Sequence, residues 1–323
     1  MKIPAFLFFL LPISCFAQEV FNSHRMDREL TVRYDNDVVF VIDQYYTSGA
    51  DISYARVVSE EKLLGRLFKT SYEQSKVLMR IDYGHKIFTP QKIREPDVAR
   101  RDRPFAGWHY TGLWIDNYPS KNASNQYGVR LGMVGPSSGI GNFQLWWHDV
   151  ASITAPKGWE YEIQDEFVVN LNYLRTQRIP IAKSFDLVSE TQLTAGNGNT
   201  RAYQQLTMRL GELNPLDNSG YNRSRLSKSI PEIGTIDQFL EEGFFFYGLR
   251  AEYVNHNIFI EGSRIGSSSP HEERAEDFMI THVWGGVYSS HYTTFRVLFY
   301  RMSPEVVGGK VHRFISLELG FRF

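Results

Sequence analysis

The chain has 323 residues, with 35 Lys and Arg against 36 Asp and Glu and a formal net charge of −1. That balance excludes a protein that binds nucleic acid through a basic surface, and 42% hydrophobic residues exclude a disordered chain. A mean hydropathy of −0.32 excludes a bundle of membrane-spanning helices. Aromatic residues make up 15% of the chain, against a single Cys. This profile is typical of β-rich proteins, including outer-membrane barrels with their aromatic girdles.

Residues 1–17 have the composition of a secretory signal peptide. Lys2 precedes an apolar stretch that is too short to span a bilayer, and Ala17 ends a segment with small residues at the cleavage positions. A lipoprotein signal that uses Cys15 is the alternative, although Ala17 offers the better site. Cleavage after Ala17 predicts a mature chain, residues 18–323, with no cysteine for disulfides or thiolate metal ligands.

The mature chain alternates apolar and polar residues with a period of two, which indicates strands. Around residues 77–83, for example, apolar side chains oppose Arg80 and Asp82. A soluble β-sandwich alternates in the same way, but buried arginines are accommodated better in the wet lumen of a barrel. The chain also ends on the aromatic residue Phe323 within such a segment. About twelve segments have this character, near residues 30–37, 47–57, 76–85, 106–116, 126–134, 163–175, 183–195, 201–211, 244–261, 276–288, 292–302 and 312–323.

An even strand number fits a single antiparallel transmembrane β-barrel, and we expect one all-β domain over residues 18–323. Polar stretches interrupt the strands at 86–104, 135–160, 212–242 and 263–275, and are expected to form long extracellular loops. Residues 231–242 have the composition of a short helix within one of them. Such loops on a rigid barrel are where chemistry is expected.

One candidate site lies across the first predicted hairpin. Asn36 and Asp37 end the first strand, and Asp43 with the Tyr46-Thr47-Ser48-Gly49 run opens the second. Two carboxylates, an amide and a hydroxyl are hard oxygen donors of the kind that Ca²⁺ prefers. Ordinary turn chemistry is the simpler explanation of the same residues.

A second candidate site contains His148, which can act as a base near neutral pH. Gln144 shares its face if this loop segment is helical; otherwise His148 is one loop histidine among nine. Gly135-Pro136-Ser137-Ser138-Gly139 formally matches the nucleophile elbow G-x-S-x-G. That elbow requires an α/β hydrolase, so Ser137 is not expected to be a nucleophile.

A third candidate is the basic loop that contains Lys92, Arg94 and Arg103. Such cations can hold phosphates or carboxylates of an anionic lipid. A solvated loop with a stiff proline turn is the simpler interpretation.

Taken together, these segments resemble the lipid A 3′-O-deacylase family of outer-membrane barrels (the LpxR type). The resemblance covers the mature chain and is carried by motifs in the expected order. They are N-D at 36–37, Y-T-S-G at 46–49, F-T-P at 88–90, D-R-P-F-A-G-W at 102–108, G-M-V-G-P at 132–136, Q-x-x-x-H at 144–148, G-W at 158–159 and A-G-N at 195–197.

The resemblance implies a twelve-stranded barrel in the bacterial outer membrane, most simply a monomer, with a Ca²⁺-dependent site near its extracellular rim. Its substrate would be lipid A of lipopolysaccharide, from which it removes the 3′-linked acyloxyacyl group. The implied roles are His148 as the base that activates water, Asp37 as metal ligand, Asn36, Thr47 and Gln144 lining the site, and Lys92, Arg94 and Arg103 facing the lipid phosphates.

The chain departs from the family pattern at Thr154, where another member has an acidic residue six positions beyond the histidine. Glu160 and Glu162 are acidic residues elsewhere in the same loop. Two other functions stay open. One is a non-catalytic barrel that binds or transports lipid, and the other is a phospholipase barrel that acts through a serine.

Overall fold

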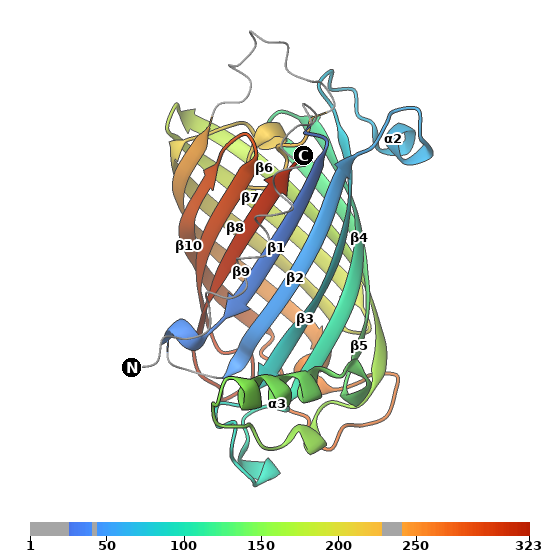
Figure 1. The fold of residues 1–323 in the computed structure, drawn as a ribbon, viewed down its shortest axis with the longest axis vertical. Helices are drawn as coiled ribbons and strands as arrows, with labels where there is room; N and C mark the ends of the chain where they lie inside the picture. The colour runs from blue at the N-terminus through green and yellow to red at the C-terminus, as the bar shows by residue number, and fades with distance from the viewer. Residues whose placement is uncertain (1–25, 41–43, 228–240) are drawn as a thin grey trace.

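A computed structural model describes residues 26–40, 44–227 and 241–323. It is a closed antiparallel barrel in which each strand pairs with the next and β1 pairs with β12 (Figure 1). The strands are β1 (Arg28–Asn36), β2 (Tyr45–Val57), β3 (Val77–Thr89), β4 (Ala106–Ser120), β5 (Ala123–Val134), β6 (Glu166–Ala182), β7 (Phe185–Gly196), β8 (Asn199–Glu212), β9 (Glu242–Asn257), β10 (Phe278–Ser289), β11 (Thr293–Met302) and β12 (His312–Arg322).

The predicted fold class, a transmembrane barrel of about twelve strands, is confirmed. The ninth predicted strand, 244–261, is too long, because β9 ends at Asn257 and residues 258–261 form the short helix α4 (Ile258–Glu261). The predicted helix at 231–242 lies almost wholly outside the described residues, and Glu242 begins β9. The structure also contains α2 (Leu63–Phe68) and α3 (Ile140–Val150), neither of which was predicted as an element. Short 3-10 turns η2 to η6 cover Val38–Phe40, Val98–Arg100, Pro136–Ser138, Trp159–Tyr161 and Leu216–Asn218.

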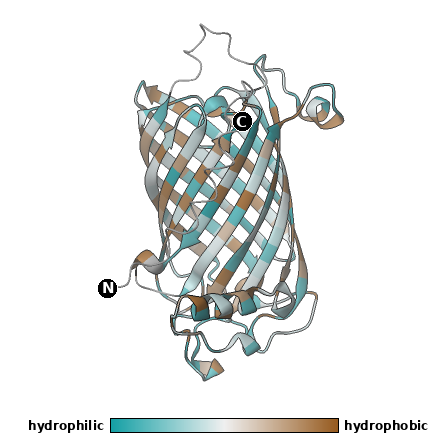
Figure 2. Cartoon of the chain, in the orientation of Figure 1, coloured by the Kyte–Doolittle hydropathy of each residue, from teal (hydrophilic) through white to brown (hydrophobic). Residues whose placement is uncertain are grey.

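Alternate side chains along each strand point outward and inward, which gives the banded pattern of Figure 2. In β3, Ile81 and Tyr83 are exposed on the outside while Arg80 and Asp82 are buried inside. Asp82 accepts hydrogen bonds from the Trp114 indole at 3.0 Å and from Arg130 at 2.7 Å. The inward arginines are therefore paired, as expected for a barrel lumen. Within the described residues, no helix is long and apolar enough to cross a membrane.

The two ends of the barrel differ. The end called here the α3 rim carries the connections 37–44, 90–105, 135–165, 197–198, 258–277 and 303–311. At the opposite rim, β1 begins and β12 ends. This rim also carries the connections 58–76, 121–122, 183–184, 213–241 and 290–292. Inside the α3 rim, aromatic side chains fill the lumen: Tyr46, Phe88, Trp108, Tyr110, Phe259 and Phe314 belong to one buried cluster.

Residues 213–227 lie inside the opposite rim. The Tyr221 hydroxyl donates to Glu190 of β7 at 2.9 Å, and Arg223 donates to Glu318 of β12 at 3.0 Å. Contacts with strands on different sides of the barrel mean that this segment crosses the lumen. Together with the aromatic cluster, it leaves the barrel interior occupied at both ends.

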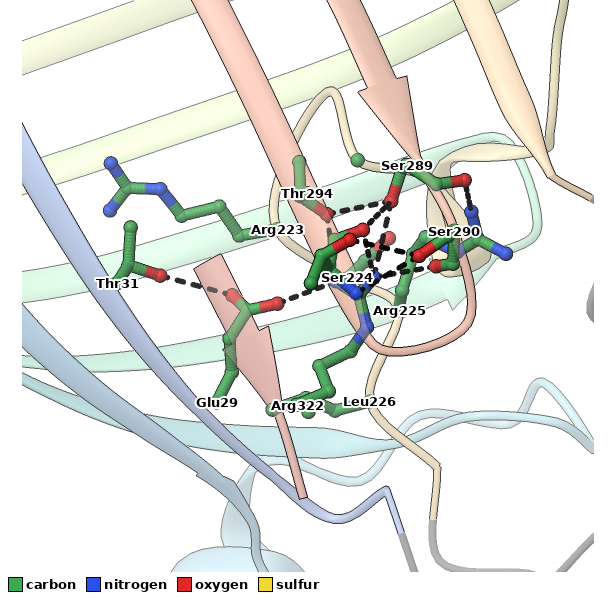
Figure 3. A network of polar contacts seen from close by, with 12 residues as sticks. Glu29, Thr31, Arg223, Ser224, Arg225, Leu226, Ser289, Ser290, Thr294 and Arg322 are labelled. Carbon is green, nitrogen blue, oxygen red and sulfur yellow. Dashed lines mark hydrogen bonds and ion pairs between the residues drawn. The ribbon is translucent and has the colours of Figure 1, made fainter. Parts of the chain in front are cut away.

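Arg322 joins β12 to β1, the two strands whose pairing closes the barrel at its seam (Figure 3). It is 2% exposed, donates to Glu29 of β1 and to the Thr294 hydroxyl, both at 2.8 Å, and also reaches the carbonyl of Ser290 at 2.7 Å. Because Glu29 is equally buried, removing the guanidinium would leave a carboxylate without its countercharge.

We therefore expect Arg322→Met to destabilise the barrel by about 3–5 kcal/mol. Arg28→Met is the matched control, since Arg28 pairs with Asp27 at a largely exposed position and its loss should change stability by less than about 1 kcal/mol. Reversible urea unfolding of each variant in lipid vesicles measures both effects. Equal midpoints for the two variants would show that the seam does not depend on this ion pair.

Candidate active site

The first group of candidate residues lies at the ends of β1 and β2. Tyr46 pairs with Phe88 and Ser48 pairs with Ile87, so Thr47 is the extra residue of a bulge, a feature that redirects a side chain. Its hydroxyl hydrogen-bonds the hydroxyl of Thr89 at 2.7 Å. Because Tyr46 and Phe88 face the lumen cluster, the bulge places Thr47 on the outer side of the wall.

Asp37 lies beside Thr47. Its backbone N–H donates to the Thr47 carbonyl at 3.2 Å, and its carboxylate accepts the backbone N–H of Gln44 at 2.9 Å. The side chain is only 1% exposed. Asn36, the last residue of β1, donates from its amide to the Tyr34 hydroxyl at 3.1 Å. The structure thus brings Asn36, Asp37 and Thr47 together, whereas Asp43, the second carboxylate of this predicted site, lies outside the described residues.

The second group of candidate residues lies on α3, which packs against β3 and β4 at the same rim (Figure 1). Its buried residues are Ile140, Gly141, Gln144 and His148, which form one stripe of the helix. A Cβ on Gly141 would lie 2.8 Å from the Trp159 ring, and one on Gly107 would lie 2.6 Å from Ile140. Both glycines therefore permit the close approach of helix, wall and loop.

Trp159 fixes the amide of Gln144. The indole N–H donates to Gln144 Oε1 at 2.9 Å, which assigns the other end of the amide as the N–H₂ group. Gln144 is 2% exposed and its Nε2 has no hydrogen-bond partner among the described residues. A buried donor without an acceptor is unfavourable, so this atom is suited to receive an oxygen of a ligand.

His148 lies one turn after Gln144 and is oriented by the loop that follows. Its Nδ1 donates to the Thr154 carbonyl at 2.6 Å, which leaves Nε2 as the nitrogen that carries the lone pair. The helix ends in a Schellman turn: Ser152, at φ +54°, donates to the Asp149 carbonyl, and Ile153 donates to the His148 carbonyl. This turn brings the chain back over the imidazole.

The backbone bond explains how Thr154 is accommodated where a relative has an acidic residue. Because the main-chain carbonyl accepts the bond from His148, orientation of the ring does not require a carboxylate at that position. Of the two other acidic residues in the loop, Glu160 is exposed and Glu162 is 5% exposed. The structure describes no group of three or more His, Cys, Asp or Glu side chains suited to a metal.

The predicted substrate cations divide into two kinds. Lys92 and Arg94 are exposed on the 90–105 loop, which is joined to the α3 loop by the Lys157 N–H donating to the Ile93 carbonyl at 2.7 Å. Arg103 is 0% exposed; it pairs with Glu305 and donates to the Phe259 carbonyl at 3.0 Å. Arg103 therefore holds the rim together instead of presenting a cation at the loop surface.

Ser137 has the surroundings of a turn residue, as expected. It lies in η4, between Gly135 and Gly139 with positive φ angles. Its hydroxyl donates to Asp165 at 2.7 Å and its backbone N–H donates to the same carboxylate at 2.7 Å. A carboxylate bound in this way orients the turn and is not the histidine base of a nucleophile elbow.

The sequence does not identify Trp159 as a supporting residue, although the Gly158-Trp159 pair is among the motifs. Gly158 has a φ of +119°, and a Cβ there would lie 2.4 Å or less from the guanidinium of Arg101. The Arg101 guanidinium lies over the rings of Phe105 and Tyr161. The conformation of Gly158 thus places the indole beneath α3.

Burial in the loop, with the nearby charge of Asp165, raises the pKa of Glu162 to about 8. Since an unfolded Glu titrates near 4.3, the folded loop binds an extra proton between these values, so its stability falls as the pH rises from about 4.3 to about 8 and changes no further above that. We expect protease cleavage within residues 151–165 to accelerate across this range and to level off above about 8. Glu162→Gln should abolish the acceleration, whereas Glu160→Gln, at an exposed position, should retain it. A pH-independent cleavage rate in the unmodified protein would contradict the assignment.

A closed antiparallel barrel with an apolar outer surface has the architecture of an outer-membrane protein. Polar side chains of α3 are buried against its wall at one rim. The chain belongs to the family described as "Outer membrane protein LpxR", whose model matches residues 3–323. This is the family that the sequence motifs resembled, and the location in the outer membrane is confirmed.

The solved structure of one family member supports the fold. LpxR from Salmonella typhimurium is 17% identical, with a TM-score of 0.71 over 91% of this chain and 100% of that chain. The translocator domain of the autotransporter NalP from Neisseria meningitidis is 8% identical, with a TM-score of 0.42 over 97% of this chain and 93% of its own. No curated protein sequence matches the chain. At these identities the likeness concerns the fold alone.

Proposed function

We propose that this protein is an esterase of the outer membrane that removes the 3′-linked acyloxyacyl group from lipid A by attack of a water molecule. Family membership and the resemblance of the motifs support the substrate. The observation that carries the chemistry is the buried pair on α3, an oriented imidazole and an amide donor on the same helix face.

His148 acts as the general base. Its Nε2 removes a proton from water as the water oxygen bonds to the ester carbonyl carbon. When the tetrahedral intermediate collapses, the carbon–oxygen bond to the sugar breaks and the imidazolium returns the proton to the leaving oxygen. The Nδ1–Thr154 hydrogen bond, at 2.6 Å, holds the ring in one orientation throughout.

Gln144 supplies a hydrogen-bond donor for the developing negative oxygen. Its Nε2 is buried and without a partner in the described structure, and the Trp159 indole holds the amide from the other side. A donor fixed before the reaction stabilises charge without having to reorient.

The residues at the ends of β1 and β2 fit a calcium ion. Asp37 supplies a buried carboxylate, and Asn36 and Thr47 add neutral oxygens of the type that Ca²⁺ takes. When bound, the ion supplies positive charge beside the carbonyl oxygen. A single carboxylate predicts weak binding, since calcium affinity rises with the number of charged ligands.

The exposed cations Lys92 and Arg94 suit the phosphates of lipid A. Their loop is hydrogen-bonded to the loop that follows α3, so a phosphorylated sugar held there lies at the same rim as the site. The α3 rim also carries the majority of the long connections, which in outer-membrane barrels face the cell exterior. That orientation directs the site toward the outer leaflet.

The proposal predicts that cells expressing the protein contain lipid A that has lost an acyloxyacyl mass. His148→Gln should reduce the rate about 10²–10⁴-fold, the usual contribution of a general base. His282→Gln is the control, since His282 lies on β10 and contacts Tyr247. Mass spectrometry of extracted lipid A measures both. Unchanged lipid A from cells that contain the folded, unmodified barrel would favour a non-catalytic barrel instead.

Trp159→Phe removes the indole N–H and keeps an aromatic ring against Gly141. We expect a lower kcat with little change in KM, because only the transition-state donor loses its orientation. Gln144→Ala should show the same pattern, and the double variant should be no slower than Gln144→Ala alone. Additive losses in a steady-state assay would show that Trp159 acts independently of Gln144.

Chelation should abolish activity, and added Ca²⁺ should restore it with a half-maximal concentration on the order of 10⁻⁴–10⁻³ M. Asp37→Asn should raise that concentration, whereas Asp277→Asn, which changes an exposed carboxylate at the same rim, should not. Full activity after exhaustive chelation would exclude a role for the metal.

A further inference from the structure

The exposed side of α3 carries an apolar stripe that the site does not use. Phe143, Trp146, Trp147 and Val150 are between 38% and 58% exposed. Their spacing of i, i+3, i+4 and i+7 places them on one flank of the helix. Asn142, Leu145 and Asp149 lie on the opposite flank of the helix. The buried stripe of Gln144 and His148 separates this flank from the apolar one on the side of the helix that faces the barrel.

Phe143 shows which way the apolar flank points. The centroid of its ring lies 5.2 Å from that of the His85 ring, with an angle of 66° between the two ring planes. Ile87 of β3 is buried beneath the helix beside Ile140. His85 lies on the same outward face of β3, two residues farther from the α3 rim. The apolar flank therefore faces along the outer wall toward the middle of the barrel.

In that direction the flank continues directly into the apolar outer surface of the barrel. On the outer face of β3, Tyr83 and then Ile81 lie beyond His85 in the direction of the opposite rim, and they are 58% and 44% exposed. Leu113 of the neighbouring β4 is 43% exposed. This surface is the lipid-facing band of an outer-membrane barrel. A tryptophan-rich flank at its edge has the composition of a helix that lies in the membrane interface.

We infer that α3 is docked in the outer leaflet of the membrane, with Phe143, Trp146, Trp147 and Val150 among the lipid chains and the flank of Asn142 and Asp149 in water. The occupant of the stripe is lipid, because the stripe is continuous with the surface that lipid already covers. Helix and wall then enclose His148 at the height of the interface, so that a lipid ester reaches it from the side. The docking itself does not rest on the proposed activity.

Spin labels test the placement without any turnover. Cys15 is replaced by serine, and Trp146→Cys and Asp149→Cys are labelled separately in protein reconstituted into phospholipid vesicles. The label at 146 should collide with oxygen, which concentrates in lipid, and should be several-fold less accessible to a water-soluble nickel complex than the label at 149. Equal nickel accessibility at the two positions would overturn the inference. So would spin–spin broadening at 146 that disappears on dilution with unlabelled protein, because a second copy would then cover the stripe.

Native fluorescence provides a measurement that does not depend on cysteine variants. Brominated lipids should quench the tryptophan fluorescence of the unmodified protein more than that of a Trp146→Phe, Trp147→Phe double variant. Among the described residues, the exposed tryptophan that this variant keeps is Trp284 on the barrel wall, which is 37% exposed. Equal fractional quenching of the two proteins would contradict docking. If docking is found while lipid A is unchanged, the membrane helix stands and the proposed activity fails.

Discussion

Every strand of this barrel must satisfy its backbone hydrogen bonds inside lipid, where water cannot replace them. Pairing of β1 with β12 closes the sheet and removes both edges. The closed sheet forces side chains to alternate between lipid and lumen, and the lumen consequently holds paired charges such as Arg130 and Asp82. Irregular backbone is confined to the rims, and the site is found there.

Two features of the site follow from that confinement. The wall contributes its residues through a bulge at Thr47, where strand pairing is already irregular near the rim. His148 and Gln144 come from a loop that is long enough to form a helix and return beneath it through Trp159. A rigid barrel and a short helix thus hold polar groups that are buried yet lie beside the lipid phase.

Much of this could be predicted from the sequence, because period-two alternation is a local signal. The twelve strands followed from it, and the pairing of Asn36 and Asp37 with Thr47 followed from a hairpin. The helix α3 was harder to recognise. Its buried residues include Gly141 and the polar Gln144 and His148, and apolar residues instead occupy an exposed flank. A helix that contacts both protein and lipid does not show the single apolar face of a soluble helix.

Other features could not be predicted because they depend on tertiary contacts. Arg103 belongs to a basic loop in the sequence, but its burial depends on Glu305, which is 202 positions away. The acceptor for His148 is the backbone carbonyl of Thr154, which every residue type has. The side chain at this position therefore does not predict the hydrogen bond. The segment inside the opposite rim, residues 213–227, is polar, and its composition predicts only a loop.

The central claim is that water, activated at the α3 rim, attacks an acyl carbon of lipid A. Hydrolysis of purified lipid A in ¹⁸O-labelled water tests it directly, with both products analysed by mass spectrometry. The account predicts one ¹⁸O atom in the released fatty acid and none in the sugar product. Label in the sugar hydroxyl, or no product from the calcium-supplemented, folded protein, would contradict it.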